Sequence, residues 1–74
     1  MKVAQQTINM IHGQLGPARD HQEGVEVNGR IQGQRVETIE GGERYIPTAF
    51  NYTARVVLRN DRLEWDIIAV NPIR

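Results

Sequence analysis

The strongest constraint in this sequence is the alternation of side chains on either side of Asn60-Asp61. A two-residue turn at this dipeptide places apolar side chains opposite one another on one face of a hairpin, whereas a one-residue shift would scramble both faces. The predicted pairs are Leu58 with Leu63, Val56 with Trp65, Ala54 with Ile67, and Tyr52 with Ala69. We therefore expect an antiparallel hairpin whose apolar face, with Trp65 on it, belongs to the core.

The opposite face of this hairpin is only partly polar. It pairs Arg55 with Asp66, which predicts a cross-strand ion pair, and it pairs Val57 with Glu64. Toward the open end of the hairpin the same face carries Thr53, Val57, Ile68 and Val70. Since one helix cannot cover both faces of a sheet, either the long first strands fold over this side or another chain covers it. We favour an interface with another chain, formed by these four residues.

The N-terminal segment has the spacing of an amphipathic helix. Over residues 2–15 the residues on one side of such a helix are Val3, Ala4, Thr7, Ile8, Ile11 and Leu15. Gly16-Pro17 ends the pattern, because proline cannot continue the helical hydrogen bonds. A helix of about four turns is marginal by itself, so we expect it to lie on a sheet. Residues 17–24 are polar and predict a connecting loop.

Residues 25–34 alternate between apolar or glycine positions and polar positions. Asn28-Gly29 is a common signal for a tight hairpin turn, but a turn there would set Val27 against Arg30 and mix the two faces. An unbroken strand with a glycine bend or bulge keeps the apolar residues on one side. We favour the single strand, with a hairpin at Asn28-Gly29 as the alternative.

A second hairpin is predicted at Gly41-Gly42, between residues 35–40 and 43–48. A two-residue loop at the glycines would oppose the like charges of Glu40 and Glu43. A loop over residues 41–43 avoids this clash, and the pairs it predicts are Glu40 with Arg44 and Ile39 with Tyr45. Proline lacks the N–H that a central strand needs, so Pro47 predicts that the following strand lies at an edge or stops there.

These elements predict one small α+β domain over residues 1–74. Its expected architecture is an N-terminal amphipathic helix packed on a curved antiparallel sheet of about four strands, an α-β-β-β-β meander. A chain of 74 residues is near the lower limit for a single core, and it has no cysteine to form disulfides or thiolate metal sites. Association with another chain is the support that remains.

Charge and hydropathy exclude several classes of protein. Nine basic residues balance nine acidic ones, so there is no general attraction to nucleic acid or anionic lipid. No apolar stretch approaches the ~20 residues that span a bilayer, and no apolar leader is visible at the N-terminus. We therefore expect a cytoplasmic protein without membrane contact.

No group of residues predicts catalysis. The chain has no cysteine and no serine, and no base is placed to activate a threonine. Glu37, Glu40 and Glu43 flank the glycine turn and are interpreted as a solvated loop. The set Asp20, His21 and Glu23 lies in the polar linker and is interpreted in the same way rather than as a metal site. We expect no enzyme activity, no cofactor and no bound metal.

The leading functional hypothesis is a non-enzymatic protein-binding or assembly module that self-associates, with a dimer favoured. A phage- or plasmid-type inhibitor or accessory protein is one form that such a module takes. The first alternative is a single-stranded nucleic-acid-binding module that uses the arginines Arg30, Arg35, Arg55, Arg59 and Arg62. The second is a small-molecule pocket between helix and sheet, lined by Ile8, Ile11, Trp65 and Ile67.

Overall fold

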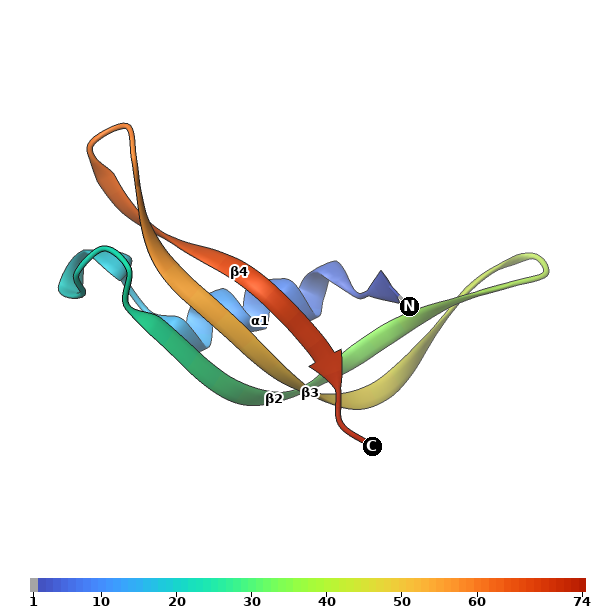
Figure 1. Cartoon of the computed structure of the whole chain (residues 1–74). Helices are drawn as coiled ribbons and strands as arrows, with labels where there is room; N and C mark the ends of the chain where they lie inside the picture. The colour runs from blue at the N-terminus through green and yellow to red at the C-terminus, as the bar shows by residue number, and fades with distance from the viewer. Residues whose placement is uncertain (1) are drawn as a thin grey trace.

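The fold is one helix on one antiparallel sheet, as the computed structural model shows for residues 2–74 (Figure 1). The elements in chain order are β1 (Lys2–Val3), α1 (Gln5–Leu15), the short 3-10 helix η1 (Ala18–Asp20), β2 (Glu26–Ile39), β3 (Gly42–Arg59) and β4 (Arg62–Pro72). The strands neighbour one another in the order β1-β2-β3-β4 and all pairs are antiparallel. The predicted α+β class, with an N-terminal helix on a four-strand antiparallel meander, is confirmed.

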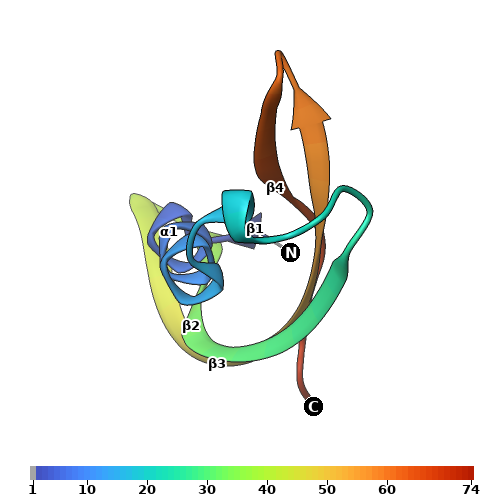
Figure 2. The ribbon, with the colours of Figure 1, turned by 90° about the vertical axis from the view of Figure 1, so that its left-hand side faces the viewer.

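The sheet is strongly curved and α1 lies on its concave side. Figure 2 shows the helix nearly end-on, with β2 and β3 bending beneath it. The molecule measures 45 × 26 × 16 Å, so its shortest dimension leaves room for little more than a helix and a sheet. Two hairpin tips, at the β2–β3 and β3–β4 turns, extend beyond the helix (Figure 1). In both views (Figure 1 and Figure 2) no helix or strand of residues 2–74 lies over the convex face.

The helix begins later than its apolar spacing predicts. Lys2 and Val3 pair with Val36 and Arg35 of β2, and Ala4 is still extended, with φ −63° and ψ 141°. The Ala4 N–H donates to the Gln34 carbonyl at 3.0 Å. A partner strand outside the segment therefore takes the first residues, which helical spacing cannot foresee. The end is as expected, with Gly16 at φ +74° closing α1.

The strand predicted over residues 25–34 is confirmed as one unbroken strand and extends further, to Ile39. Its register with β3 runs without a shift from Glu26 opposite Arg55 to Ile39 opposite Gly42, so Asn28-Gly29 is not a turn and no bulge interrupts the pairing. Gly29 gives room to its cross-strand neighbour, because a Cβ there would lie 2.2 Å from Cζ of Tyr52. Glycine is needed in the strand for close packing.

The predicted register of the β2–β3 hairpin is wrong. The turn is Glu40-Gly41, with Ile39 opposite Gly42, so Arg44 faces Glu37 and not Glu40. This register gives Arg44 Nη2 a hydrogen bond to Glu37 Oε1 at 3.0 Å and keeps Glu43 away from Glu40. Gly41 supplies the positive φ, +87°, that the tight turn requires.

Pro47 lies inside β3, which does not stop there as one alternative predicted. The other alternative, an edge position, is confirmed locally, because β4 first pairs with β3 at Phe50 opposite Pro72. On its other side Pro47 faces Gln34. Both backbone groups of Gln34 point away from β3, toward β1 and α1, so this pair exchanges no hydrogen bonds and the missing N–H costs nothing.

The β3–β4 hairpin turns at Asn60-Asp61 as predicted, and both residues have positive φ, 51° and 63°. The pairs Leu58–Leu63, Val56–Trp65 and Ala54–Ile67 are confirmed. Beyond them the register shifts by one, so that Thr53 faces Ala69 and Tyr52 faces Val70. The predicted Tyr52–Ala69 pair is therefore wrong. Ile68 is the extra residue of a β-bulge.

The core lies between α1 and the concave face of the sheet. Phe50, Ile11, Val56 and Thr7 are its largest fully buried side chains. The predicted inward position of Trp65 is confirmed: its ring packs against the Ile11 cluster, and Nε1 donates to the Gly16 carbonyl at 2.9 Å. This bond ties β4 to the end of the helix across 49 residues of chain.

Candidate functional site

The convex face of the sheet is exposed and mostly polar. On β2 the side chains of alternate residues lie on this face, and all four of Glu26, Asn28, Arg30 and Gln32 are exposed. Three of their four neighbours on β3 are polar as well, Ala49 being the exception, and Asn28 accepts a hydrogen bond from Thr53 Oγ1 at 2.7 Å. The face is thus a row of cross-strand polar contacts along β2 and β3.

The four residues predicted as an interface do not share one face. Thr53 is half-buried against Asn28, Val57 is half-buried, and Ile68 is 48% exposed. Val70 lies inside, because the bulge at Ile68 turns it toward Tyr52, and it packs against the core cluster of Ile11. The assignment of Val70 to the outer face is therefore wrong. Thr53, Val57 and Ile68 remain a candidate contact strip.

Most of the predicted arginine cluster is neutralised by carboxylates. Arg55 donates to Glu26 on β2 at 2.9 Å, so the predicted ion pair with Asp66 is not formed although the two face each other. Asp66 lies instead 3.8 Å from Arg59, which also lies 3.7 Å from Glu64. On the convex face, Arg55 thus pairs with a carboxylate of β2, and Arg59 pairs with two carboxylates of β4.

Two of the five arginines have no acidic partner among the described residues. Within residues 2–74, Arg30 on β2 and Arg62 at the start of β4 form no ion pair within 4.0 Å. Both are exposed. The remaining arginine, Arg35, lies near Glu37 on the other face of β2, so the five do not form one continuous basic surface.

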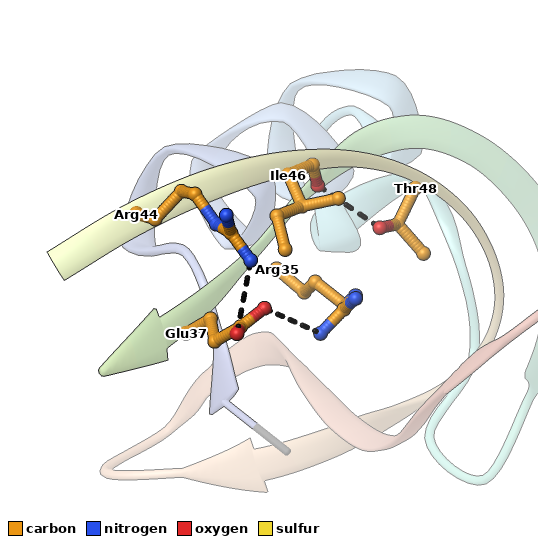
Figure 3. Close-up of polar contacts among 5 residues, drawn as sticks. All are labelled: Arg35, Glu37, Arg44, Ile46 and Thr48. Carbon is orange, nitrogen blue, oxygen red and sulfur yellow. Dashed lines mark hydrogen bonds and ion pairs between the residues drawn. The ribbon is translucent and has the colours of Figure 1, made fainter. Parts of the chain in front are cut away.

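The β2–β3 hairpin carries its own charge cluster, shown in Figure 3. The Glu37 carboxylate lies between Arg44, at 3.0 Å, and Arg35, at 3.7 Å. Glu43, another predicted acidic candidate, lies 3.9 Å from Lys2. Thr48 Oγ1 donates to the Ile46 carbonyl at 2.9 Å beside this cluster. Glu37 and Glu43 are thus each engaged by basic side chains, and these ion pairs link β1, β2 and β3.

The predicted pocket residues lie in the packed core. Ile11 is fully buried, and Ile8, Trp65 and Ile67 pack against its cluster. Hollows occur instead along the N-terminal half of α1. One of about 230 Å³ is lined by Gln6, Thr7, Met10, Gln32, Gly33, Gln34 and Pro47, and one of about 250 Å³ by Ala4, Gln5, Gln6, Gln34 and Tyr45. Among the described residues, no charged side chain lines either hollow.

Of the linker residues interpreted above as solvated, namely Asp20, His21 and Glu23, His21 contacts a side chain of β4. His21 packs edge-on against Trp65, with ring centroids 4.9 Å apart. Over the part of the chain that the structure describes, no group of three or more histidine, aspartate or glutamate side chains is close enough to hold a metal ion. Nor does any helix among these residues have the length and apolar character to cross a membrane.

The border of the sheet along β2 is the feature that sequence reasoning missed. The Gln34 N–H donates to Thr7 Oγ1 and its carbonyl accepts from Ala4, so both groups point away from β3. Backbone groups alternate in direction along an antiparallel strand, so those of Glu26, Asn28, Arg30 and Gln32 point outward as well. β1 pairs only with Arg35 and Val36, which leaves the first half of this border without a partner strand from residues 2–74.

Comparison with known proteins gives no relative from which a function could be transferred. No family model matches the sequence, no curated protein matches it, and no solved structure matches the fold. The functional argument therefore rests on the surfaces described above.

Proposed function

We propose that this protein is a small non-enzymatic assembly module that associates with a second copy of itself, a dimer being the simplest product. The observation that carries this proposal is the unpartnered border of β2 beside a convex face that residues 2–74 leave uncovered. Unpaired N–H and C=O groups on a sheet border are a template for another strand. Two copies joined by a two-fold axis satisfy both borders at once.

The size of the protein supports the same proposal. A chain of 74 residues buries about 60% of the surface of its unfolded state, and this one has no cysteine to form a disulfide. Several large apolar side chains stay 43–54% exposed, namely Met10, Ile39, Tyr45, Leu58 and Ile68. Where association covers such surface, each Å² of apolar area removed from water stabilises the complex by about 25 cal/mol.

Sedimentation velocity over a wide range of protein concentrations tests the proposal. We expect a monomer–dimer equilibrium, with the dimer mass reached at micromolar concentrations. A single species of monomer mass at every concentration would contradict self-association.

Nucleic-acid binding is the less supported alternative, because Arg35, Arg55 and Arg59 each lie 3.7 Å or less from a carboxylate. A basic surface that binds single strands loses affinity steeply as salt rises. We expect no binding of a single-stranded oligonucleotide even at low salt. Tight binding with a steep salt dependence would favour the arginine hypothesis instead.

A further inference from the structure

The open part of the β2 border is short and bounded on both sides. At one end Thr7 and Ala4 form hydrogen bonds with the backbone N–H and carbonyl of Gln34. At the other end the Gly24 N–H donates to the Val56 carbonyl of β3, so it points away from the border. The Val56 N–H in turn donates to the Val25 carbonyl, so the backbone groups of odd-numbered residues in this segment face β3. The outward groups therefore belong to Glu26, Asn28, Arg30 and Gln32. A partner strand of about five residues fits this length.

The side chains along this border are complementary to themselves. When the segment pairs antiparallel with a second copy about Asn28, Glu26 of each chain faces Arg30 of the other, and Asn28 faces Asn28. All three positions are outward-facing, so each pair exchanges two main-chain hydrogen bonds. We infer that two copies of this chain join through residues 26–30 of their β2 strands, in this register, to form one continuous sheet. The inference rests on the proposed self-association and names its surface.

The contacts within one chain leave these groups ready for a partner. Arg30 is exposed and forms no ion pair with any carboxylate of residues 2–74. Asn28 accepts the hydroxyl of Thr53 through Oδ1, which leaves its side-chain N–H groups to donate to the facing Asn28. Glu26 is held by Arg55 at 2.9 Å, so Arg30 of the second copy completes an Arg–Glu–Arg row across the junction.

Other registers of the same border are less favourable. Centring the pairing on Gly29 sets Asn28 against Arg30 and Glu26 against Gln32, which leaves the charges unmatched. Centring it on Arg30 brings the two Arg30 side chains opposite each other. Like charges directly opposite destabilise a strand pair, whereas unlike charges stabilise it. Of these registers, the one centred on Asn28 pairs every charge.

The middle of the β4 border is unsuited to self-pairing. Centring two β4 strands on Glu64, Trp65 or Asp66 in each case brings two carboxylates opposite each other. The bulge at Ile68 and Pro72 at the strand end further interrupt the outward row of backbone groups. Over the middle of β4, charge and backbone therefore both favour the β2 border.

A charge-exchange experiment tests this junction. Arg30→Glu alone sets the introduced carboxylate against Glu26 twice, and Glu26→Lys alone sets the introduced ammonium group against Arg30 twice. We expect each variant alone to associate about 10- to 100-fold more weakly than the parent. An equimolar mixture of the two gives two attractive pairs at one junction. Glu26 of the first variant faces Arg30 of the second, and the carboxylate introduced at position 30 faces the ammonium group introduced at position 26. The mixture should therefore form a heterodimer far more readily than either variant forms a homodimer, measured by sedimentation and by native mass spectrometry.

Arg62→Glu is the matched control, since Arg62 is also exposed and forms no ion pair within residues 2–74 but lies outside this border. It should associate like the parent. If the parent dimerises and the border variants dimerise equally well, or if only Val57→Glu dissociates it, the β2 junction is wrong while self-association stands. A parent that is monomeric at all concentrations overturns both proposals.

Amide hydrogen exchange gives a readout that does not depend on any variant folding. The N–H groups of Asn28 and Arg30 point outward, whereas those of Val27 and Gly29 point toward β3. We expect the outward amides to exchange at least about tenfold more slowly at dimer-forming concentrations than in the dilute protein, with the inward amides slow in both. Equal rates for Asn28 and Arg30 in the two conditions would overturn the junction.

Discussion

Thr7 and Gln34 join helix α1 to the border of β2 by two hydrogen bonds. The Gln34 N–H donates to Thr7 Oγ1 at 2.9 Å, and the hydroxyl donates to the Gln34 carbonyl at 3.3 Å. Thr7 is 2% exposed and lies among apolar residues on the buried side of the helix. A side chain thus takes the place of the next strand at this point and ends the open border of β2 at Gln32.

Removing the hydroxyl should destabilise the fold. Thr7→Val keeps the shape of the side chain but takes from the Gln34 backbone its N–H acceptor and one of its carbonyl donors, at a cost of about 1–3 kcal/mol in the free energy of unfolding. Urea denaturation followed by circular dichroism, at concentrations where the chain is monomeric, measures the change. Thr38→Val, at an exposed strand position, is the control and should change stability by less than about 0.5 kcal/mol. Equal effects of both substitutions would contradict this role of Thr7.

A methyl group should have opposite effects at two glycines. A Cβ at Gly33 would lie 2.4 Å from Cγ2 of Thr7, so Gly33→Ala forces helix and sheet apart and should cost about 1–3 kcal/mol. A Cβ at Gly13, inside α1, meets nothing within 4 Å, so Gly13→Ala should stabilise the helix by up to about 1 kcal/mol. Thermal unfolding should show a lowered Tm for the first variant and a raised Tm for the second. A stable Gly33→Ala protein would disprove the close approach.

The turn of the β3–β4 hairpin should respond to the residue at position 61. Asp61 has φ +63°, a conformation that glycine adopts without cost and that a β-branched residue strongly disfavours. We expect Asp61→Gly to raise the Tm and Asp61→Val to lower the stability by about 1–2 kcal/mol. The same loss of stability in both variants would indicate that the aspartate side chain, rather than the backbone conformation, matters at this turn.

The bulge on β4 predicts unequal effects for two neighbouring aliphatic residues. Val70 packs against the core and should cost about 1–2.5 kcal/mol when replaced by alanine. Ile68 is 48% exposed in the single chain, so Ile68→Ala should cost less than about 0.5 kcal/mol in the monomer. Denaturant unfolding of the two variants at equal low concentration compares them. A larger cost for Ile68 would mean that the register does not shift.

Local patterns in the sequence were sufficient for much of the fold. The alternation around Asn60-Asp61 determined the turn, three of its apolar pairs and the inward position of Trp65. Likewise, the three- to four-residue spacing up to Leu15, followed by Gly16-Pro17, determined the helix and its end. These features depend on which side chains of one short segment must share a buried face, and that information lies within the segment.

The candidate site was only partly accessible to the same reasoning. The sequence identified Arg30 as a candidate site residue because of its charge, but it did not identify Glu26 or Asn28. Polar residues alternate in the same way on a central strand and on a border strand. Whether a border is open depends on the neighbours of the strand, here the two-residue β1 and the Thr7 hydroxyl. Those neighbours come from a distant part of the chain.

By itself, then, the sequence determined the helix, the single strand through Asn28-Gly29 and the last hairpin as far as Ile67. The tertiary structure decided the pairing of Lys2 and Val3 with β2, the turn at Glu40-Gly41, the bulge that buries Val70 and the open stretch of β2. The physical reason is that a strand can satisfy its backbone hydrogen bonds in several registers of similar local energy. Contacts between side chains on different strands, such as Glu37 with Arg44 and Tyr52 with Val70, select one of them.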